Sequence, residues 1–388
     1  MKSSYLILIF FLIGCYSSKK LSNQNVAFIY KQDNVFSLAH QHRVFHQSSD
    51  STSLFLRINK NELLFKNDGS GFKANLKISY KFFSSFESET ITDSISFLLK
   101  DIPGDETKFI MHTFSFPLAT GLNKLTELTL HDLNNNQKRR DFISIDKSTL
   151  FGQQNFVVED INQNKIFENY VHVNSIFKIH YAHNPVKSIF VKYYKDDNEI
   201  AAPPFFNNYK KPFDYTPDST FEVMQDQHIR LTQTGLYHFQ VDSTMQEGKT
   251  IFVFQHSYPE IKQVVDLVYP LRYITTKKEF DDILSVSKPK LSVDKLWLEV
   301  GGNKDRARKL IKHYYGRVRN SNNFFTSNKE GWKTDRGIIY IVYGPPHAIY
   351  KNSFSETWIY GDESNMMSIS FNFLKVKILK FTITIKIY

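Results

Sequence analysis

The feature that most constrains the fold is a long series of short segments in which apolar and polar positions alternate. In the first segment Leu54, Leu56 and Ile58 occupy every second position, and Arg57 lies at one of the positions between them. Further runs of this kind cover residues 72–83, 91–99, 109–116, 125–130 and 140–145. Successive side chains of a β-strand point to opposite faces, so a period of two predicts strands with one buried face. We therefore predict an antiparallel β-sandwich over residues 51–147.

A second series of strand-like runs covers residues 176–180, 189–194, 221–224, 227–232, 235–241 and 250–254. Aromatic residues make up 15% of the chain, with 35 Phe and 21 Tyr, and such side chains favour strands. The run from Gly235 to Phe239 is typical of a late strand in an immunoglobulin-like module. We predict two immunoglobulin-like β-sandwich domains, the second over residues 148–270.

The pattern changes to a helical one after residue 270. Thr276 and Glu279 have the spacing of a capping box, and Pro289 is expected to end the helix that they begin. Ser292 is expected to cap a second short helix and Asn303 a third. The third helix has an apolar stripe at a helical period, formed by Ala307, Leu310, Ile311, Tyr314 and Val318.

Strands return near the C-terminus. Residues 338–343 are a β-branched and aromatic run that predicts a strand, and Gly344 and Pro345 would end it. With further strands near residues 358–360 and 367–373, this predicts a C-terminal α+β domain over residues 271–388. The overall fold class is therefore mainly β with α+β. The last residues, 374–388, are a repetitive Lys, Ile, Thr and Phe run, which we interpret as a truncated or frame-shifted end with an exposed edge strand.

The N-terminus is typical of a bacterial lipoprotein signal. An apolar run over residues 5–13 follows Lys2 and is shorter than the ~20 residues that a membrane-spanning helix needs. It leads into Gly14 and Cys15, which complete a lipobox, and Cys15 is the only cysteine of the chain. We predict a signal peptide over residues 1–14 and a lipidated Cys15 at the start of a tether over residues 15–50. This tether is expected to become ordered somewhere after residues 26–30. The alternative is that Cys15 is an incidental residue of an ordinary secretory signal.

A lipid on Cys15 would make the membrane a partner and would place the protein in the cell envelope. Tyr16 follows the cysteine where an aspartate would signal retention in the inner membrane, so we expect the outer membrane. The formal net charge is +10, from 49 Lys and Arg against 39 Asp and Glu. This excess is spread along the chain without a basic block or a recognised binding motif, so we predict no nucleic-acid partner.

Three histidines lie in the predicted tether, at His40, His42 and His46. A His-x-His pair can bind a transition metal if a strand places both side chains on one face. We favour partly packed or solvated histidines, because the sequence provides no cysteine and no nearby acidic cluster to complete a site. We therefore predict no metal site and no cofactor.

The most specific motif lies between the helices and the last strands. It comprises Gly331, Trp332, Thr334 and Asp335, followed by Arg336. Supporting blocks are Tyr314-Tyr315-Gly316-Arg317-Val318, Tyr343-Gly344-Pro345-Pro346 and Glu356-Thr357-Trp358-Ile359-Tyr360. In this order they resemble the GWxTD domain, found in a family of bacterial envelope proteins without an established activity. The resemblance covers about the last third of the chain and implies an architecture rather than a mechanism.

Two roles are open for the signature. In the structural interpretation, which we favour, Trp332 fills the junction of helices and sheet while Thr334 or Asp335 bonds the loop backbone. In the functional interpretation the loop forms a site, with Asp335 or Glu356 as a base and His347 as an acid or ligand. These three are weak catalytic candidates, and we assign no catalytic residue.

The sequence therefore predicts a lipid-anchored cell-envelope protein. It would bind or scaffold an envelope protein partner through its sandwich modules and GWxTD domain. The alternative is a hydrolase-like envelope enzyme with its site at the GWxTD loop.

Overall fold

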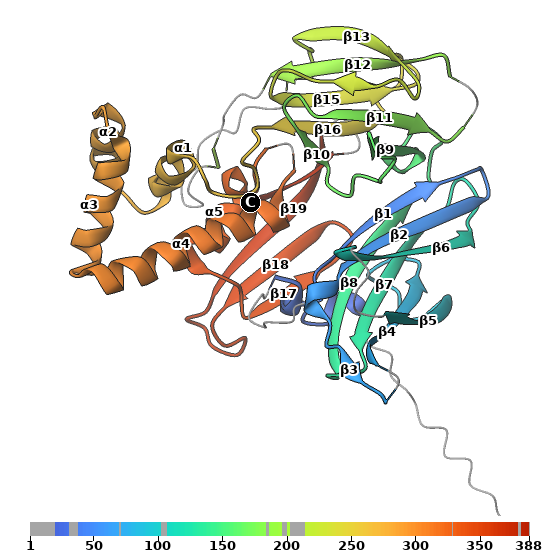
Figure 1. Cartoon of the computed structure of the whole chain (residues 1–388), viewed down its shortest axis with the longest axis horizontal. Coiled ribbons are helices and arrows are strands. Elements are labelled where there is room, and N and C mark those ends of the chain that lie inside the picture. The colour runs from blue at the N-terminus through green and yellow to red at the C-terminus, as the bar shows by residue number, and fades with distance from the viewer. Residues whose placement is uncertain are drawn as a thin grey trace, which may run out of the picture.

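The structure is a computed structural model that describes residues 20–30, 38–69, 71–101, 107–183, 186–195, 200–201, 214–327, 329–378 and 382–387. The predicted signal peptide and Cys15 lie outside these residues. Figure 1 shows two β-rich units and a C-terminal unit in which helices pack beside a sheet. The prediction of a mainly β fold with a C-terminal α+β part is confirmed.

The first β unit consists of two antiparallel sheets around one core. One sheet has the order β1-β2-β6, with β1 (His40–His46), β2 (Ser51–Asn59) and β6 (Phe109–Pro117). The other has the order β3-β4-β7-β8, with β3 (Lys66–Asn67), β4 (Phe72–Phe83), β7 (Asn123–Asp132), β8 (Gln137–Asp146) and β5 (Asp93–Asp101) paired to β4. Leu54, Leu56 and Ile58 of β2 meet Ile78 of β4 in a shared core, as the alternation predicts.

The second β unit also has two sheets. The larger has the order β10-β16-β15-β12-β13, with β10 (Tyr170–His172), β16 (Lys249–Phe254), β15 (Gly235–Gln240), β12 (Ser188–Lys195) and β13 (Ser219–Met224). The smaller has the order β14-β11-β9, with β14 (Ile229–Arg230), β11 (Ile176–Tyr181) and β9 (Phe156–Asp160). Phe177 and Ile179 of one sheet pack against Val191 and Phe239 of the other. The β-sandwich character of both units agrees with the prediction, and their immunoglobulin-like topology stays a prediction.

The C-terminal unit begins with helices and ends with a sheet. The helices are α1 (Val264–Val268), α2 (Lys277–Ser285), α3 (Pro289–Gly301), α4 (Lys304–Phe325) and α5 (Asp335–Tyr343), with the short 3₁₀ helices η5 (Tyr269–Tyr273) and η6 (Gly331–Lys333). The sheet has the order β17-β18-β19-β20, with β17 (Ala348–Lys351), β18 (Ser355–Tyr360), β19 (Ile369–Ile378) and β20 (Thr382–Ile387). The predicted capping box of Thr276 and the predicted cap of Asn303 are both present. Of the C-terminal run, residues 374–378 end β19 and residues 382–387 form β20, the last strand in this order.

Three sequence predictions for this unit are wrong. Residues 338–343 form helix α5 instead of a strand. Ile338, Ile339 and Tyr340 contact the sheet core while Ile341 contacts the helical core, so the helix is buried on several sides and lacks a polar face. Within residues 338–343 every side chain is apolar or aromatic, so this run by itself is easily taken for a strand. Likewise, Pro289 begins α3 instead of ending a helix, because a missing N–H is harmless in the first turn. Ser292 therefore lies inside α3 and is not its cap.

The predicted tether is also wrong over its described residues. Residues 40–46 form β1, and the segment before it contains the 3₁₀ helices η1 (Leu21–Asn23) and η2 (Ala27–Tyr30). The backbone N–H of Val26 donates to the carbonyl oxygen of Ile349 in β17, at 2.8 Å. Val26, Ile29 and Tyr30 are buried in the core of the C-terminal unit. A short apolar segment without a periodic pattern gave no sign of this packing. We call residues 20–30 the N-terminal segment.

None of the helices in the described residues is both long enough and apolar enough to cross a membrane.

Candidate functional site

The signature loop is held by backbone contacts that require small residues. A Cβ on Gly331 would lie 1.9 Å from the carbonyl oxygen of Ser321 in α4, and a Cβ on Gly337 would lie 2.0 Å from the carbonyl oxygen of Gly331. The Thr334 hydroxyl donates to that same Gly331 oxygen at 2.7 Å and accepts from the backbone N–H of Gly337 at 3.0 Å. Thr334 is therefore the N-cap of α5, and the loop fastens α5 onto α4.

Trp332 is buried, with 9% of its surface exposed. Its backbone N–H donates to Asn322 Oδ1 at 3.1 Å, and its carbonyl oxygen accepts from the Tyr273 hydroxyl at 2.9 Å. Its side chain belongs to the core formed by the helices, so it does not fill the helix–sheet junction that the sequence suggested. Trp358 of β18 lies there instead, in the core shared with α5.

The weak catalytic candidates do not form one site. Asp335 is the first residue of α5, where a negative charge suits the helix N-terminus. His347 is exposed, and its Nδ1 accepts from the backbone N–H of Gly361 at 3.0 Å. Of the signature residues, only Arg336 contacts the third candidate, Glu356.

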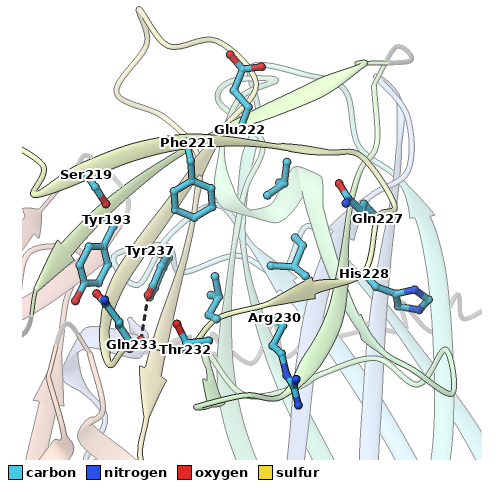
Figure 2. A pocket seen from close by; sticks show the side chains of 13 residues that line it. Tyr193, Ser219, Phe221, Glu222, Gln227, His228, Arg230, Thr232, Gln233 and Tyr237 are labelled. Atoms are coloured by element: carbon cyan, nitrogen blue, oxygen red, sulfur yellow. Dashed lines mark hydrogen bonds between the residues drawn. The ribbon is translucent and has the colours of Figure 1, made fainter.

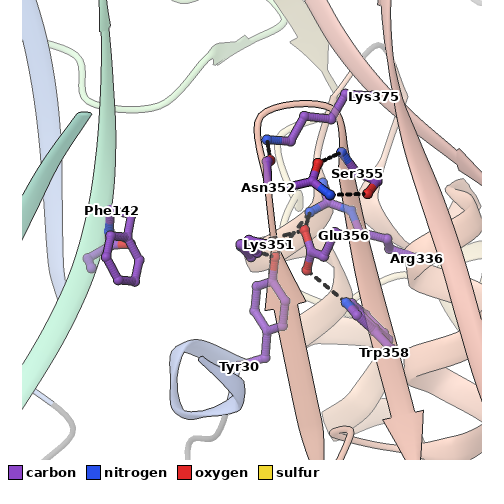
Figure 3. A network of polar contacts seen from close by, with 10 residues as sticks. Tyr30, Phe142, Arg336, Lys351, Asn352, Ser355, Glu356, Trp358 and Lys375 are labelled. Carbon is purple, nitrogen blue, oxygen red and sulfur yellow. Dashed lines mark hydrogen bonds and ion pairs between the residues drawn. The ribbon is translucent and has the colours of Figure 1, made fainter. Parts of the chain in front are cut away.

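Glu356 lies in a buried polar network, and only 1% of its side chain is exposed (Figure 3). Its Oε1 accepts from Trp358 Nε1 at 2.7 Å. Its Oε2 lies 3.4 Å from Arg336 Nη1 and 3.5 Å from Lys351 Nζ. The Tyr30 hydroxyl completes the network, because both Lys351 Nζ and Arg336 Nη1 donate to it at 3.1 Å. The network therefore joins the N-terminal segment, α5 and the β17–β18 hairpin.

The charges of this network hold Glu356 ionised. Burial alone would raise the pKa of Glu356, but Lys351 and Arg336 outweigh it and hold the pKa below its ordinary value. Burial raises the pKa of Tyr30. A carboxylate that is paired with two cations and closed off from solvent is a poor proton acceptor, so this geometry favours a structural role for Glu356.

A polar cavity of about 640 Å³ lies where the N-terminal segment, both β units and the C-terminal unit meet. We call it the junction cavity. Its charged lining residues are Arg43, Arg57, Arg139, Lys351, Asp141 and Glu168. Arg57 Nη2 lies 2.8 Å from Glu168 Oε1, which joins the two β units, and Arg139 Nη2 donates to the carbonyl oxygen of Ile29 at 2.7 Å. Burial lowers the pKa of Arg43 to about 10. Convergent charged groups with shifted pKa values in a cavity are typical of functional sites.

Two of the histidines from the predicted tether line this cavity together with Asp141. His40 Nε2 lies 3.3 Å from Asp141 Oδ2, and His42 Nδ1 lies 3.8 Å from the same oxygen. No acidic partner for these histidines was evident from the sequence, because Asp141 is about a hundred residues away along the chain. His46 is different: it is buried, with its ring nitrogens 2.9 Å from the Thr52 hydroxyl and 2.9 Å from the Asp146 carbonyl oxygen.

A second cavity, of about 400 Å³, lies in the second β unit between β13, β14 and β15 (Figure 2). The Tyr237 hydroxyl donates to the Gln233 carbonyl oxygen there at 3.0 Å. Figure 2 shows that the charged side chains of Glu222 and Arg230 point away from this cavity. The junction cavity is therefore the stronger candidate site.

The fold and site define a C-terminal helix–sheet domain that is built around the signature loop. A polar cavity lies where this domain meets the two β units. The family model of the GWxTD domain matches residues 235–383. The chain therefore contains a GWxTD domain, as the motif resemblance predicts. The match begins in β15, so it includes β15 and β16 of the larger sheet of the second β unit. The sequence analysis had placed the start of the domain later, at residue 271. No curated protein matches the chain.

Proposed function

We propose that the protein is a lipid-anchored scaffold of the cell envelope. In this proposal a lipid on Cys15 attaches it to a membrane, with the outer membrane as the expected location, and its folded body binds an envelope protein partner. Nucleic acid has no part in the proposal. The observation that carries it is the position of the N-terminal segment, which follows Cys15 closely and is built into the GWxTD domain.

The short stretch of chain between Cys15 and Leu21 supports the proposal that the folded protein is held close to the membrane. Leu21 begins the first helix or strand that the structure describes and is buried. It is six positions after Cys15, and an extended chain spans at most ~3.6 Å per residue, which limits the reach to about 22 Å. A lipid at Cys15 would thus hold the GWxTD domain near the bilayer surface.

The signature loop supports a scaffold over an enzyme. Gly331, Trp332 and Thr334 are buried and make internal contacts, and Glu356 is paired with Lys351 and Arg336. Residues used in this way stabilise the junction of α4 and α5. Catalytic groups would instead present polar atoms to a cavity.

The anchor is tested by metabolic labelling with an alkyne-bearing palmitate analogue in a bacterial host. Wild-type protein should be labelled and should sediment with membranes, whereas Cys15→Ala should be unlabelled and soluble. A Cys15→Ser variant serves as the closest control, because it keeps the size of the side chain but cannot form the thioether. Equal labelling of wild type and variants would refute the anchor.

The scaffold role is tested by two variants of the signature. Trp332→Ala should lower stability by ~3–5 kcal/mol because it removes a buried Trp. Asp335→Asn should fold and should retain the partners that wild type captures by cross-linking in intact envelopes. A folded Asp335→Asn protein that fails to complement a deletion strain would instead favour an enzyme.

A further inference from the structure

The open side of the first sandwich is bridged by histidines. Strand β1 is an edge of one sheet and β8 is an edge of the other. His46 contacts Asp146 near one end of this pair, and His40 and His42 contact Asp141 near the other. The two edges therefore run side by side in the same direction. Since His40 and His42 are two residues apart on β1, their side chains lie on the same face of the strand.

The protonation of His40 follows from its neighbours. Its Nδ1 lies 3.1 Å from the carbonyl oxygen of Leu38, and a carbonyl can only accept, so Nδ1 carries a proton. The other nitrogen, Nε2, faces Asp141 Oδ2 and has no hydrogen-bond partner among the described residues, although only 5% of the side chain is exposed. A lone pair facing a carboxylate oxygen is unfavourable unless a proton or a metal ion lies between them.

The other two groups also present free electron pairs. His42 Nδ1 is directed towards the same carboxylate oxygen, Asp141 Oδ2, at 3.8 Å. Asp141 Oδ1 accepts from the backbone N–H of Phe142 at 2.7 Å, which leaves Oδ2 directed towards the two rings. A backbone carbonyl on one ring and a backbone N–H on the carboxylate are the outer contacts that usually orient metal ligands.

We propose that His40 Nε2, His42 Nδ1 and Asp141 Oδ2 bind a divalent first-row transition metal ion, with Zn²⁺ as the expected ion. The three atoms lie within 4.8 Å of one another, and two of the separations are 3.3 and 3.8 Å. Ligand atoms of a tetrahedral zinc ion with bonds of 2.0–2.1 Å are about 3.4 Å apart, so small side-chain rotations complete the geometry. Two histidines and one carboxylate leave a coordination position for water or for an anionic group in the junction cavity.

The surrounding charges set the affinity of this site. The positive charge of Arg43 acts on His42, and the positive charge of Arg139 acts on Asp141. Both cations oppose a metal ion, but Arg139 is directed towards the carbonyl oxygens of Phe28 and Ile29. The same cations would favour an anionic group as the additional ligand. The proposal stands on the first β unit alone and does not depend on a lipid at Cys15.

The test uses tag-free mature protein treated with a chelator and then dialysed. Titration calorimetry with Zn²⁺ should give one site per chain, and Co²⁺ should give the visible absorption of a tetrahedral ion. His42→Ala and Asp141→Asn should each weaken Zn²⁺ binding at least tenfold. Melting curves without metal check that both variants fold, and His42 suits this test because 30% of its side chain is exposed.

His180→Ala is the matched control. His180 Nδ1 lies 3.2 Å from Asp226 Oδ1, in an exposed histidine–aspartate pair that no second histidine completes among the residues that the structure describes. This variant should bind Zn²⁺ as wild type does. The proposal is overturned if wild type binds no stoichiometric Zn²⁺, in which case a proton bridges His40 and Asp141. It is equally overturned if both site variants retain binding or if His180→Ala loses as much affinity as they do.

Discussion

Replacing Glu356 by Gln removes the only negative charge from a network that contains two buried cations. The side chains of Lys351 and Arg336 are 16% and 13% exposed, and both lie about 3.5 Å from Glu356 Oε2. At an effective dielectric constant of about 20, each pair contributes roughly 5 kcal/mol of attraction. Desolvation of the three charges offsets much of this, so we expect a net loss of ~3–5 kcal/mol when the carboxylate is removed. The Gln amide would also have to direct its NH₂ group either towards the two cations or towards the Trp358 N–H, and all of these are donors.

The assay is urea unfolding followed by tryptophan fluorescence. All three tryptophans, Trp297, Trp332 and Trp358, lie in the C-terminal unit, so the signal reports on this unit rather than on the two β units. Glu363→Gln is the matched control, because Glu363 is an exposed carboxylate in the turn between β18 and β19. It accepts a hydrogen bond from the Tyr350 hydroxyl at 2.7 Å, which a Gln amide oxygen can also accept, so this variant should cost less than ~0.5 kcal/mol. A Glu356→Gln protein within ~0.5 kcal/mol of wild type would refute the importance of the network.

The pH dependence gives the same prediction a second readout. The folded pKa of Glu356 is lower than its unfolded value of about 4.3, so its contribution to stability is complete above the unfolded pKa and is lost as the pH falls through the folded pKa. The stability difference between wild type and Glu356→Gln should therefore shrink below about pH 4. A difference that stays constant down to pH 2 would show that the carboxylate charge is not the cause.

Four further substitutions test the packing of the domain by the same unfolding assay. Gly331→Ala should cost several kcal/mol, because its Cβ would lie 1.9 Å from the Ser321 oxygen, whereas Gly316→Ala, with open space around it in α4, should stabilise the domain by ~0.5–1 kcal/mol. Equal effects would refute the steric argument. Thr334→Ala should cost ~1 kcal/mol by removing the N-cap of α5, and no loss would contradict that role. Tyr30→Phe should cost ~1–3 kcal/mol by removing the acceptor of two cationic donors, and an unchanged midpoint would place the N-terminal segment outside the folded domain.

Local patterns were sufficient for the elements that have one buried face. β4 begins and ends at residues 72 and 83, where the alternation begins and ends. The cap at Asn303 and the apolar stripe behind it likewise indicated α4. The spacing of apolar residues in these elements reveals which side is buried, because one side of each packs on a core and the other faces solvent.

The sequence failed where contacts decided the structure. Helix α5 is buried on several sides, and its β-branched and aromatic run at residues 338–343 indicated a strand, although the cap at Thr334 was a signal that could have indicated a helix. The pairing of Lys351 with Glu356 in the β17–β18 hairpin could also have been predicted from the sequence, because the two residues flank the turn at Asn352. The approach of Asp141 to His40 was not, since alternation predicts a strand but does not indicate which strand lies beside it.

Hydrogen–deuterium exchange of residues 20–30 tests most directly whether the chain behind Cys15 is part of the GWxTD domain. The Val26 amide donates to the carbonyl oxygen of Ile349 in β17 at 2.8 Å, and Val26 is buried. We expect this segment to be protected as strongly as β17 and to lose protection together with it in Glu356→Gln. Complete exchange of residues 20–30 within seconds, while β17 remains protected, would show a free tether and contradict the account.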